Sequence, residues 1–180
     1  MNIVQPIRDP DKIIDIKRYL RESNKRNYIM FLVGINTGLR ISDILKLRVG
    51  DVQGGTISIR EQKTRKQKRF MINPALRKEL QEYTSGMQAD EYLFPSRQGM
   101  KQAIGRSTAY KMLRKVARMF GLEEIGCHTL RKTFGYHFYN KTRDVALLMD
   151  IFNHSDPSIT LRYIGINQDA VDRSMGSFRL

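Results

Sequence analysis

The sequence predicts a mainly helical α+β domain with one small antiparallel sheet near residues 52–72. Apolar residues recur at helical spacing through most of the chain. Around the turn at Gly54-Gly55, by contrast, residues 56–59 alternate as a strand does and residues 70–72 suit a returning strand. A chain of 180 residues with 41% hydrophobic residues can also bury one sizeable core. We therefore expect a single domain over residues 1–180.

Two helices are expected first, over residues 10–22 and 24–36. Asp9 can cap the first helix, with Pro10 in its opening turn. The second helix is expected to end at Gly38, because glycine readily takes the left-handed conformation that closes a helix.

Arg40 follows this glycine closely and precedes a short apolar helix. Local sequence allows two interpretations of Arg40: a surface arginine whose stem covers apolar residues, or a buried guanidinium held in a fixed place. Asp43, three residues on, could lie against that stem and fix the guanidinium.

A strongly basic turn connects the two predicted strands. Residues 61–69 hold five basic residues and one acid. Such a run is either a solvated hairpin tip or a finger laid on a phosphate backbone, and a tip can be solvated until DNA arrives. The candidate DNA contacts here are Arg65, Lys66, Lys68 and Arg69.

After a helix that starts at Pro74, residues 97–107 are expected to form a flexible basic loop. Ser107 is then expected to cap a helix to about Phe120, with Tyr110 among its inward residues. No acid occurs between positions 97 and 122, so the polar face of this helix is wholly basic. It could lie along duplex DNA, and a solvated face is the alternative. The candidate contacts are Arg106, Lys111, Arg114 and Lys115.

Composition indicates the class of partner. The 32 Lys and Arg against 18 Asp and Glu give a net charge of +14, which favours a polyanion, with nucleic acid ahead of an acidic membrane surface. A generally basic soluble protein is the alternative. The single cysteine excludes an internal disulfide and suits a reducing cytoplasm. We expect no signal peptide or membrane span, because no apolar run approaches 18 residues.

The first cluster with chemical potential is HTLR. His128 and Arg131 lie three positions apart, so on a helical turn they share one face and can meet one ligand. Cys127 and His128 are too few for a zinc site, and the acids show no paired spacing for magnesium. We therefore predict no metal site, and any phosphate chemistry would depend on arginine, histidine and lysine.

The second cluster is HSDPSITLRY. Ser155 or Asp156 can cap a new helix, with Pro157 in its first turn. That helix would carry Tyr163 about two turns down, back towards the level of His154. Two histidines, an arginine and a tyrosine hydroxyl that converge on one point suit a phosphate-like group.

Four motifs together resemble the catalytic domain of the tyrosine recombinase (phage integrase) family. They are TGLRISDILKL at 37–47, the lysine-bearing hairpin QKTRKQKRFMI at 62–72, HTLR at 128–131, and HSDPSITLRY at 154–163. Their order and spacing match the family from about residue 24 to the C-terminus. Each motif is weak alone, but the four together are specific.

The resemblance implies a set of residues that act on one phosphodiester: Arg40 and Arg131 as the clamp of the scissile phosphate, Lys63 as general acid for the 5′ oxygen, His128 as the first box-II histidine, His154 at the position held by His or Trp, Tyr163 as nucleophile, and Asp43 as supporting acid. Lys66 and Lys68 lie in the same loop as Lys63 and leave the choice of lysine open.

The implied activity is site-specific cleavage and rejoining of DNA through a 3′-phosphotyrosine, for a phage or mobile element in the nucleoid of a bacterial cytoplasm. The bond energy stays in the covalent intermediate, so neither ATP nor another cofactor is expected. One alternative is a DNA-binding regulator on the same fold with little or no strand exchange. Another is nicking and relaxation of DNA without specific synapsis.

The resemblance also raises questions about domains and partners. Family members typically carry a separate core-binding domain, whereas about 23 residues precede the match here, so no such domain is expected. A naturally minimal recombinase, a fragment and a regulatory relative all fit this length. The tail, residues 164–180, has apolar residues at helical spacing. It is expected either to dock on a neighbouring subunit of a homo-oligomer on DNA or to pack on its own core, and an accessory DNA-binding protein is a further candidate partner.

Overall fold

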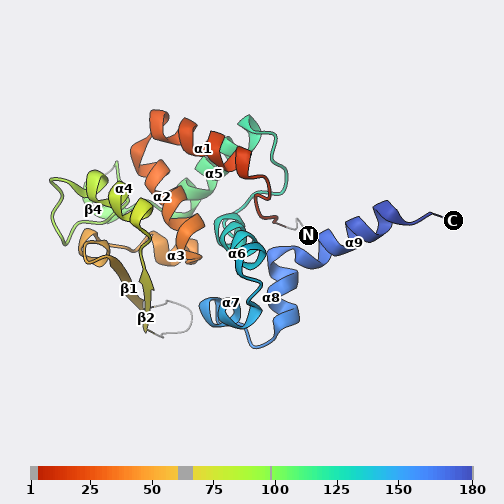
Figure 1. Ribbon diagram of the computed structural model, residues 1–180. Coiled ribbons are helices and arrows are strands. Elements are labelled where there is room, and N and C mark those ends of the chain that lie inside the picture. Colours follow the sequence, from red (N-terminus) through yellow and green to blue (C-terminus); the bar gives the residue numbers. More distant parts are fainter. Residues whose placement is uncertain (1–3, 61–66, 98, 180) are drawn as a thin grey trace.

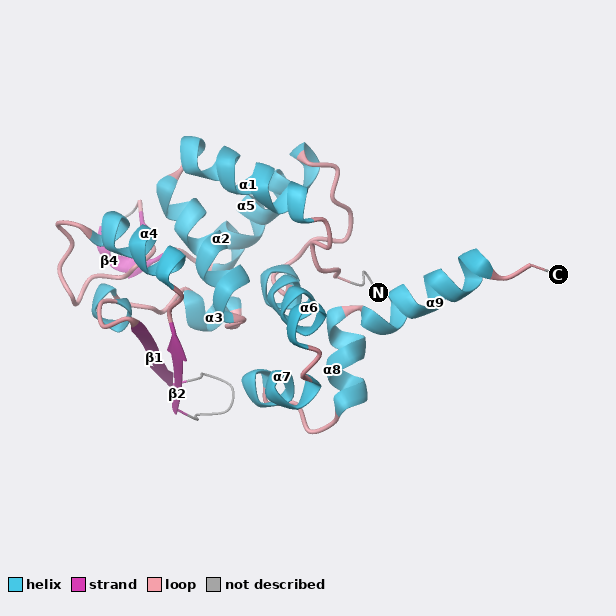
Figure 2. Ribbon diagram, in the orientation of Figure 1, coloured by secondary structure: helices cyan, strands magenta, loops and turns pink. Residues whose placement is uncertain are grey.

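The computed structural model describes residues 4–60, 67–97 and 99–179, and helices dominate it (Figure 2). The mainly helical α+β class is confirmed. No helix in the described ranges is long and apolar enough to cross a membrane. The helices are α1 (Pro10–Ser23), α2 (Lys25–Thr37), α3 (Ile41–Ile44), the 3-10 helix η1 (Val49–Val52), α4 (Pro74–Thr84), α5 (Arg106–Met119), α6 (Thr129–Thr142), α7 (Val145–Phe152), α8 (Pro157–Ile164) and α9 (Ile166–Ser177).

Two hydrophobic clusters share helix α6, which lies between them (Figure 1). The larger cluster is built from α1 to α5 and their connections, and includes Leu130 of α6. The smaller cluster joins α6, α7 and α8 through Phe152 and Ile164, with Phe134 packed against it. Since both clusters contact one helix, the N-terminal end of α6 lies at the junction of two packed units.

The caps expected at Asp9 and Gly38 form where the sequence places them. The Asp9 side chain accepts a hydrogen bond from the backbone N–H of Asp11, with Pro10 at the first position of α1. Helix α2 ends at Gly38, whose φ of 65° is left-handed and whose N–H donates to the Gly34 carbonyl. These two caps fix the start of α1 and the end of α2, the helix that precedes Arg40.

The expected sheet is an antiparallel pair of β1 (Thr56–Arg60) and β2 (Gln67–Met71), in which Thr56 pairs with Met71. Strand β2 begins three residues earlier than predicted, because residues 67–69 continue the pairing with β1. The backbone of Lys68 and the exposed Arg69 therefore lie in a strand. Lys63, Arg65 and Lys66 lie outside the described residues.

The predicted flexible loop at 97–107 is wrong. A second antiparallel pair forms there, from β3 (Pro95–Ser96) and β4 (Gly99–Ala103). The physical reason is the buried Ile104, whose N–H donates to the Phe94 carbonyl at 2.9 Å and draws the chain against the core. Helix α5 then begins at Arg106 with Gly105 as N-cap, so Ser107 is not the cap.

The inward orientation predicted for Tyr110 is also wrong. Its side chain is exposed, whereas Ala109 and Leu113 occupy the core-facing positions of α5. Tyr110 is one residue, about 100° around the helix, from Ala109. The aromatic ring of Tyr110 therefore does not mark the buried face of α5.

Two glycines allow helices to approach α6 closely. A Cβ on Gly34 of α2 would lie 2.5 Å from Leu130 Cδ1. A Cβ on Gly135 of α6 would lie 2.7 Å from Ile164 Cγ2 and 2.8 Å from the Phe152 ring. Close packing of α8 on α6 therefore depends on the missing side chain at position 135.

We expect Gly135→Ala to lower the free energy of unfolding by about 1–3 kcal/mol, because an added methyl group must displace core side chains. Thermal denaturation measures this change. Gly176→Ala is the matched control, since a Cβ there meets nothing within 4 Å and alanine favours an exposed helix. Equal melting temperatures for the two variants would contradict tight α6–α8 packing.

The N-terminal arm, residues 4–9, runs along α6 and reaches the start of α9. The backbone N–H of Ile7 donates to Thr133 Oγ1 at 2.9 Å. Arg8 Nε donates to Asp169 Oδ1 of α9 at 2.8 Å. Beyond this ion pair α9 projects away from the body (Figure 1) and buries none of its residues. The arm thus holds the root of α9 and leaves the rest of the helix exposed.

Candidate active site

Helix α8 carries Tyr163 back to His154, as the spacing predicts. The Asp156 side chain accepts from the N–H groups of Ser158 and Ile159, with Pro157 at the first position. The rings of His154 and Tyr163 meet edge to face, with centroids 5.3 Å apart. His154 Nδ1 lies 3.0 Å from Thr160 Oγ1. This contact holds the His154 imidazole against α8, the helix that carries Tyr163.

His128 meets the tyrosine hydroxyl directly. It occupies the N-cap position of α6, and its Nδ1 lies 3.2 Å from the Tyr163 hydroxyl oxygen. The two residues are 35 positions apart, so the contact depends on the packing of α8 against α6. This is hydrogen-bond distance, at which a proton can pass from the phenol to an imidazole.

Arg131 is buried and held from both hydrophobic clusters. Its Nη1 donates to the Gly38 carbonyl at 2.6 Å, and its Nη2 donates to the Phe152 carbonyl at 2.9 Å. The guanidinium carbon lies 4.1 Å from the centre of the Phe152 ring. The charge of Arg131 also acts on Tyr163, whose pKa it lowers. A planar cation is thus fixed beside the phenol before any ligand arrives.

Arg40 lies near enough to His128 and Tyr163 for its charge to act on both. It is half-buried at the N-cap of α3, and its charge lowers the pKa of both His128 and Tyr163. Asp43 is buried one turn on, and its N–H donates to the Arg40 carbonyl at 2.9 Å. Arg40 and Asp43, together with Arg131 of α6 bound to the Gly38 carbonyl, therefore place two arginines and an acid around the end of α2.

The two groups in contact have pKa values shifted in opposite directions. Burial raises the pKa of the Tyr163 phenol, and the positive charges of Arg131 and Arg40 oppose that rise. Burial lowers the pKa of His128, and nearby cations lower it further, with Arg106 first and Lys132 next. A protonated phenol thus faces a neutral imidazole at pH 7.

Lys132 is a component of the site that the sequence reasoning missed. Its Nζ lies 5.0 Å from the centre of the Tyr163 ring, and burial, followed by the charge of Arg8, lowers its pKa. Lysine beside a tyrosine face stabilises the ring by a cation–π contact. The sequence shows that Lys132 directly follows Arg131, but only the fold shows that Tyr163 of α8 lies beside it.

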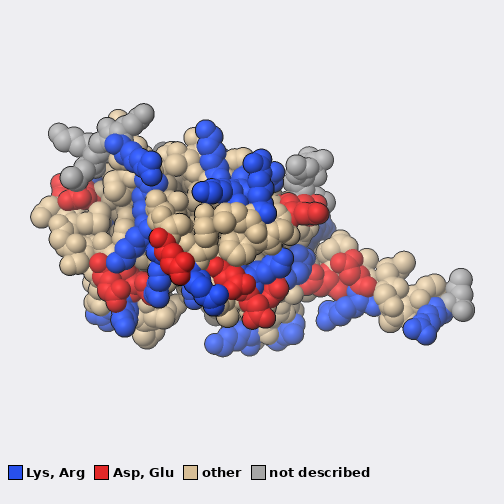
Figure 3. Space-filling model, turned by 90° about the horizontal axis from the view of Figure 1, so that it is seen from above, with Lys and Arg blue, Asp and Glu red and all other residues tan. Residues whose placement is uncertain are grey.

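A basic surface extends from this site along α5. Figure 3 shows Lys and Arg side chains along the upper edge of the body, and Lys and Arg interspersed with Asp and Glu across its lower half. Arg106, at the start of α5, is near enough to lower the pKa of His128. A groove of about 590 Å³ on α5 is lined by Tyr110, Lys111, Arg114, Lys115, Arg118 and Met119. Lys111, Arg114 and Lys115 thus line one groove, and Arg106, at the start of the same helix, lies near His128.

Comparison with known proteins shows the family of this chain. The model of the phage integrase family matches residues 9–169. The chain is 54% identical over 170 residues to the probable integrase/recombinase YoeC of Bacillus subtilis, covering 94% of this chain and 93% of that protein. It is 30% identical over 168 residues to a tyrosine recombinase of Pseudothermotoga lettingae, covering 88% of this chain and 57% of that protein.

The fold agrees with these sequence matches. The crystal structure of XerA recombinase superimposes with a TM-score of 0.75 at 22% identity, covering 98% of this chain and 65% of that one. The family model spans most of the chain, and YoeC is matched almost end to end. The chain therefore belongs to the phage integrase family, as its four motifs predict.

Proposed function

We propose that this chain cleaves and rejoins DNA strands in site-specific recombination, with Tyr163 as the nucleophile. The observation that carries the proposal is the 3.2 Å contact between the Tyr163 hydroxyl and His128 Nδ1, beside a guanidinium fixed by two carbonyls. The matched relatives are named as integrases and recombinases, which supports DNA as the substrate.

The proposed cleavage step forms one bond, breaks one bond and transfers two protons. The phenol oxygen forms a bond to phosphorus while the bond from phosphorus to the 5′ oxygen breaks. The phenol proton passes to neutral His128, and the leaving 5′ oxygen takes up a proton. Lys63 remains the proposed donor of that proton. Attack by a 5′ hydroxyl on the phosphotyrosine reverses these steps and releases Tyr163.

Two arginines are suited to hold the charge that develops in this step. The non-bridging oxygens of the phosphate become more negative in the transition state, and guanidinium groups bind them through paired N–H donors. Arg131 is already oriented by the Gly38 and Phe152 carbonyls, and Arg40 lies close by. We assign both to the phosphate, Asp43 to support of Arg40, and His154 to support of the Tyr163 ring.

A nicked duplex tests the proposed function. Cleavage a short distance 5′ of a nick releases a short fragment with a free 5′ hydroxyl, which diffuses away, so the covalent complex cannot be reversed. We expect the wild-type chain to form an adduct that resists SDS, with or without a chelator of divalent metals. Binding of the duplex without any adduct would favour the regulator instead.

The rate of cleavage should depend on pH through His128. Neutral His128 accepts the proton, so activity is present above its pKa and is lost as pH falls through it. The pKa of His128 is lowered from 6.5. The cleavage rate at sub-saturating DNA should therefore be constant around pH 7 and fall only below pH 6.5. His128→Gln should slow cleavage at neutral pH and remove the acidic fall, whereas His137→Gln should retain it. An unchanged acidic fall in His128→Gln would move the proton acceptor elsewhere.

We also propose that the catalytic unit comprises residues 1–180 and that α9 joins neighbouring copies on DNA. The sharing of α6 by both clusters supports one unit. The support for exchange is that Val171, Met175 and Phe178 are exposed on a helix that leaves its own body. A neighbour that covers this face would bury apolar surface that the monomer leaves in water.

Deleting residues 171–180 should abolish assembly on DNA and leave the monomer folded, because residues 171–179 are all exposed. The Arg8–Asp169 ion pair is retained in this variant. Light scattering with and without DNA measures the mass, and thermal denaturation measures the fold. A control that lacks only residues 179 and 180 should assemble as the full chain does. Unchanged assembly, or a much lower melting temperature, would refute this role of α9.

A further inference from the structure

A second cationic cleft lies at the start of α2. We call it the Arg26–Arg97 cleft; it encloses about 450 Å³ and is lined by Asn24, Arg26, Asn27, Ser96, Arg97, Ile104 and Thr108. Among the residues that the structure describes, the lining contains two guanidinium groups together with amides and hydroxyls, and no carboxylate. This composition matches an anion, because arginines and neutral polar groups can bind its oxygens.

Arg26 carries a charge that the protein itself does not neutralise. It is half-buried, with Nη1 donating to the Pro95 carbonyl at 2.8 Å and Nη2 to Asn27 Oδ1 at 3.5 Å. Within the described ranges, Arg26 and Arg97 form no salt bridge to an acid. Burial lowers the pKa of Arg26, and the charge of Arg97 lowers it further, against an opposing effect of Tyr83. Two like charges beside a cleft favour a bound anion.

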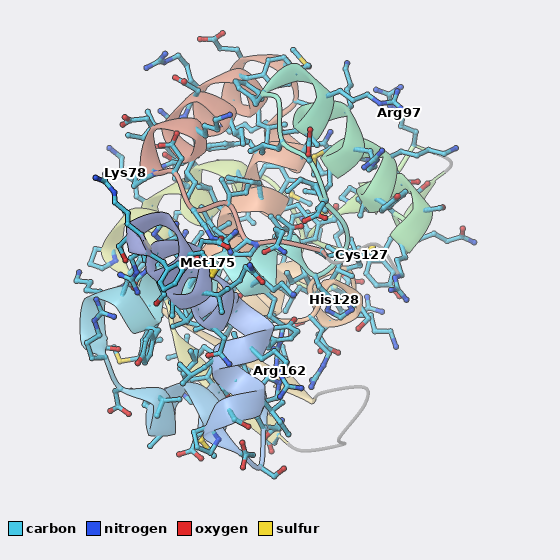
Figure 4. The ribbon with its side chains drawn as sticks, turned by 90° about the vertical axis from the view of Figure 1, so that its right-hand side faces the viewer. Lys78, Arg97, Cys127, His128, Arg162 and Met175 are labelled. Atoms are coloured by element: carbon cyan, nitrogen blue, oxygen red, sulfur yellow. The ribbon has the colours of Figure 1, made fainter. Side chains whose placement is uncertain are left out.

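The cleft is continuous with the basic surface of α5. Arg97 also lines a neighbouring cleft that contains Lys115, and Lys115 in turn lines the α5 groove. Figure 4 shows Arg97 and His128 on the same side of the molecule, with Lys78 of α4 on the opposite side. A long polyanion that enters the site at His128 can therefore follow α5 as far as Arg97.

We infer that the Arg26–Arg97 cleft binds a backbone phosphate of the DNA duplex, separate from the phosphate that is cleaved. The inference rests on the proposed function. Arg26, anchored by the Pro95 carbonyl, supplies a fixed charge at the base of the cleft, and the exposed Arg97 closes over the phosphate. The contact carries no base recognition and holds the duplex in register along α5.

Arg97→Gln tests this contact, because Arg97 is exposed and its loss leaves the Arg26–Pro95 bond in place. Duplex affinity is measured against salt concentration. We expect weaker binding and a plot of log K against log salt that is shallower by about 0.9 unit, the value for one lost phosphate contact. Lys78→Gln, an exposed charge change on the far side, should leave the slope as it is.

Duplexes with single methylphosphonate substitutions, which remove one backbone charge, locate the phosphate. One position should weaken binding of the wild type and of Lys78→Gln more than it weakens binding of Arg97→Gln, in which only Arg26 still faces the phosphate. Inorganic phosphate at fixed ionic strength tests the other source of the anion. If it raises the melting temperature of the wild type but not of Arg97→Gln, while the salt slopes are equal, the cleft binds a free anion and the inference is wrong.

Equal salt slopes for Arg97→Gln and Lys78→Gln would overturn the inference even without a phosphate effect. A failure of the proposed function would give a different result, namely no wild-type adduct on the nicked duplex. A wild type that forms the adduct while the two variants bind alike therefore refutes the cleft and leaves the function intact.

Discussion

Tyr163→Phe is expected to abolish the covalent adduct on a nicked duplex and to leave duplex affinity nearly unchanged. The substitution removes only the hydroxyl that lies 3.2 Å from His128 Nδ1. The ring keeps its edge contacts with Phe152 and His154, so α8 should remain in place. Gel separation in SDS measures the adduct, and a binding titration in the same buffer measures affinity.

Tyr139→Phe is the matched control for this experiment. Tyr139 also packs against the smaller cluster, but on α6, and it should retain full adduct formation. An undiminished adduct in Tyr163→Phe, together with a loss in Tyr139→Phe, would move the nucleophile to position 139.

Arg131→Lys is expected to reduce cleavage by a factor on the order of 10²–10³, even though the charge is kept. A lysine ammonium cannot donate to the Gly38 and Phe152 carbonyls and the phosphate in one plane, as the guanidinium is placed to do. The two buried carbonyls would also lose their partner, which should lower stability by about 1–3 kcal/mol.

The two effects are separable. The adduct rate is measured at a temperature at which denaturation curves show that the variant is fully folded. Arg18→Lys, at an exposed position of α1, controls for the exchange of arginine for lysine and should change neither quantity. A folded Arg131→Lys protein that cleaves at the wild-type rate would remove Arg131 from the proposed phosphate clamp.

Local chemistry explains why much of the site was predictable from sequence. The Asp156 cap and Pro157 fix where α8 begins, and the helical rise then carries Tyr163 to the level of His154. Gly38 ends α2 in a left-handed turn, which places Arg40 at the next helix start. Each of these contacts lies within a few residues of its signal.

The features that the sequence did not predict depend on distant contacts. Lys132 meets Tyr163 only because Gly135 lets α8 pack closely on α6. The β3–β4 pair forms where Ile104 is drawn against the core, although the local sequence resembles a loop. Tyr110 is exposed because its neighbours already fill the inward face of α5. Period and propensity do not contain the first two features, since each depends on a partner outside its own element, whereas the exposure of Tyr110 depends on which residues of α5 face the core.

The most direct test of the central proposal is to identify the residue that carries DNA. The adduct formed on a nicked duplex is digested with nuclease and protease, and the modified peptide is sequenced by mass spectrometry. We predict a nucleotide joined through its 3′ phosphate to Tyr163, in the peptide that follows Arg162. A nucleotide on any other residue, or a cleaved strand with no covalent protein, would contradict the account.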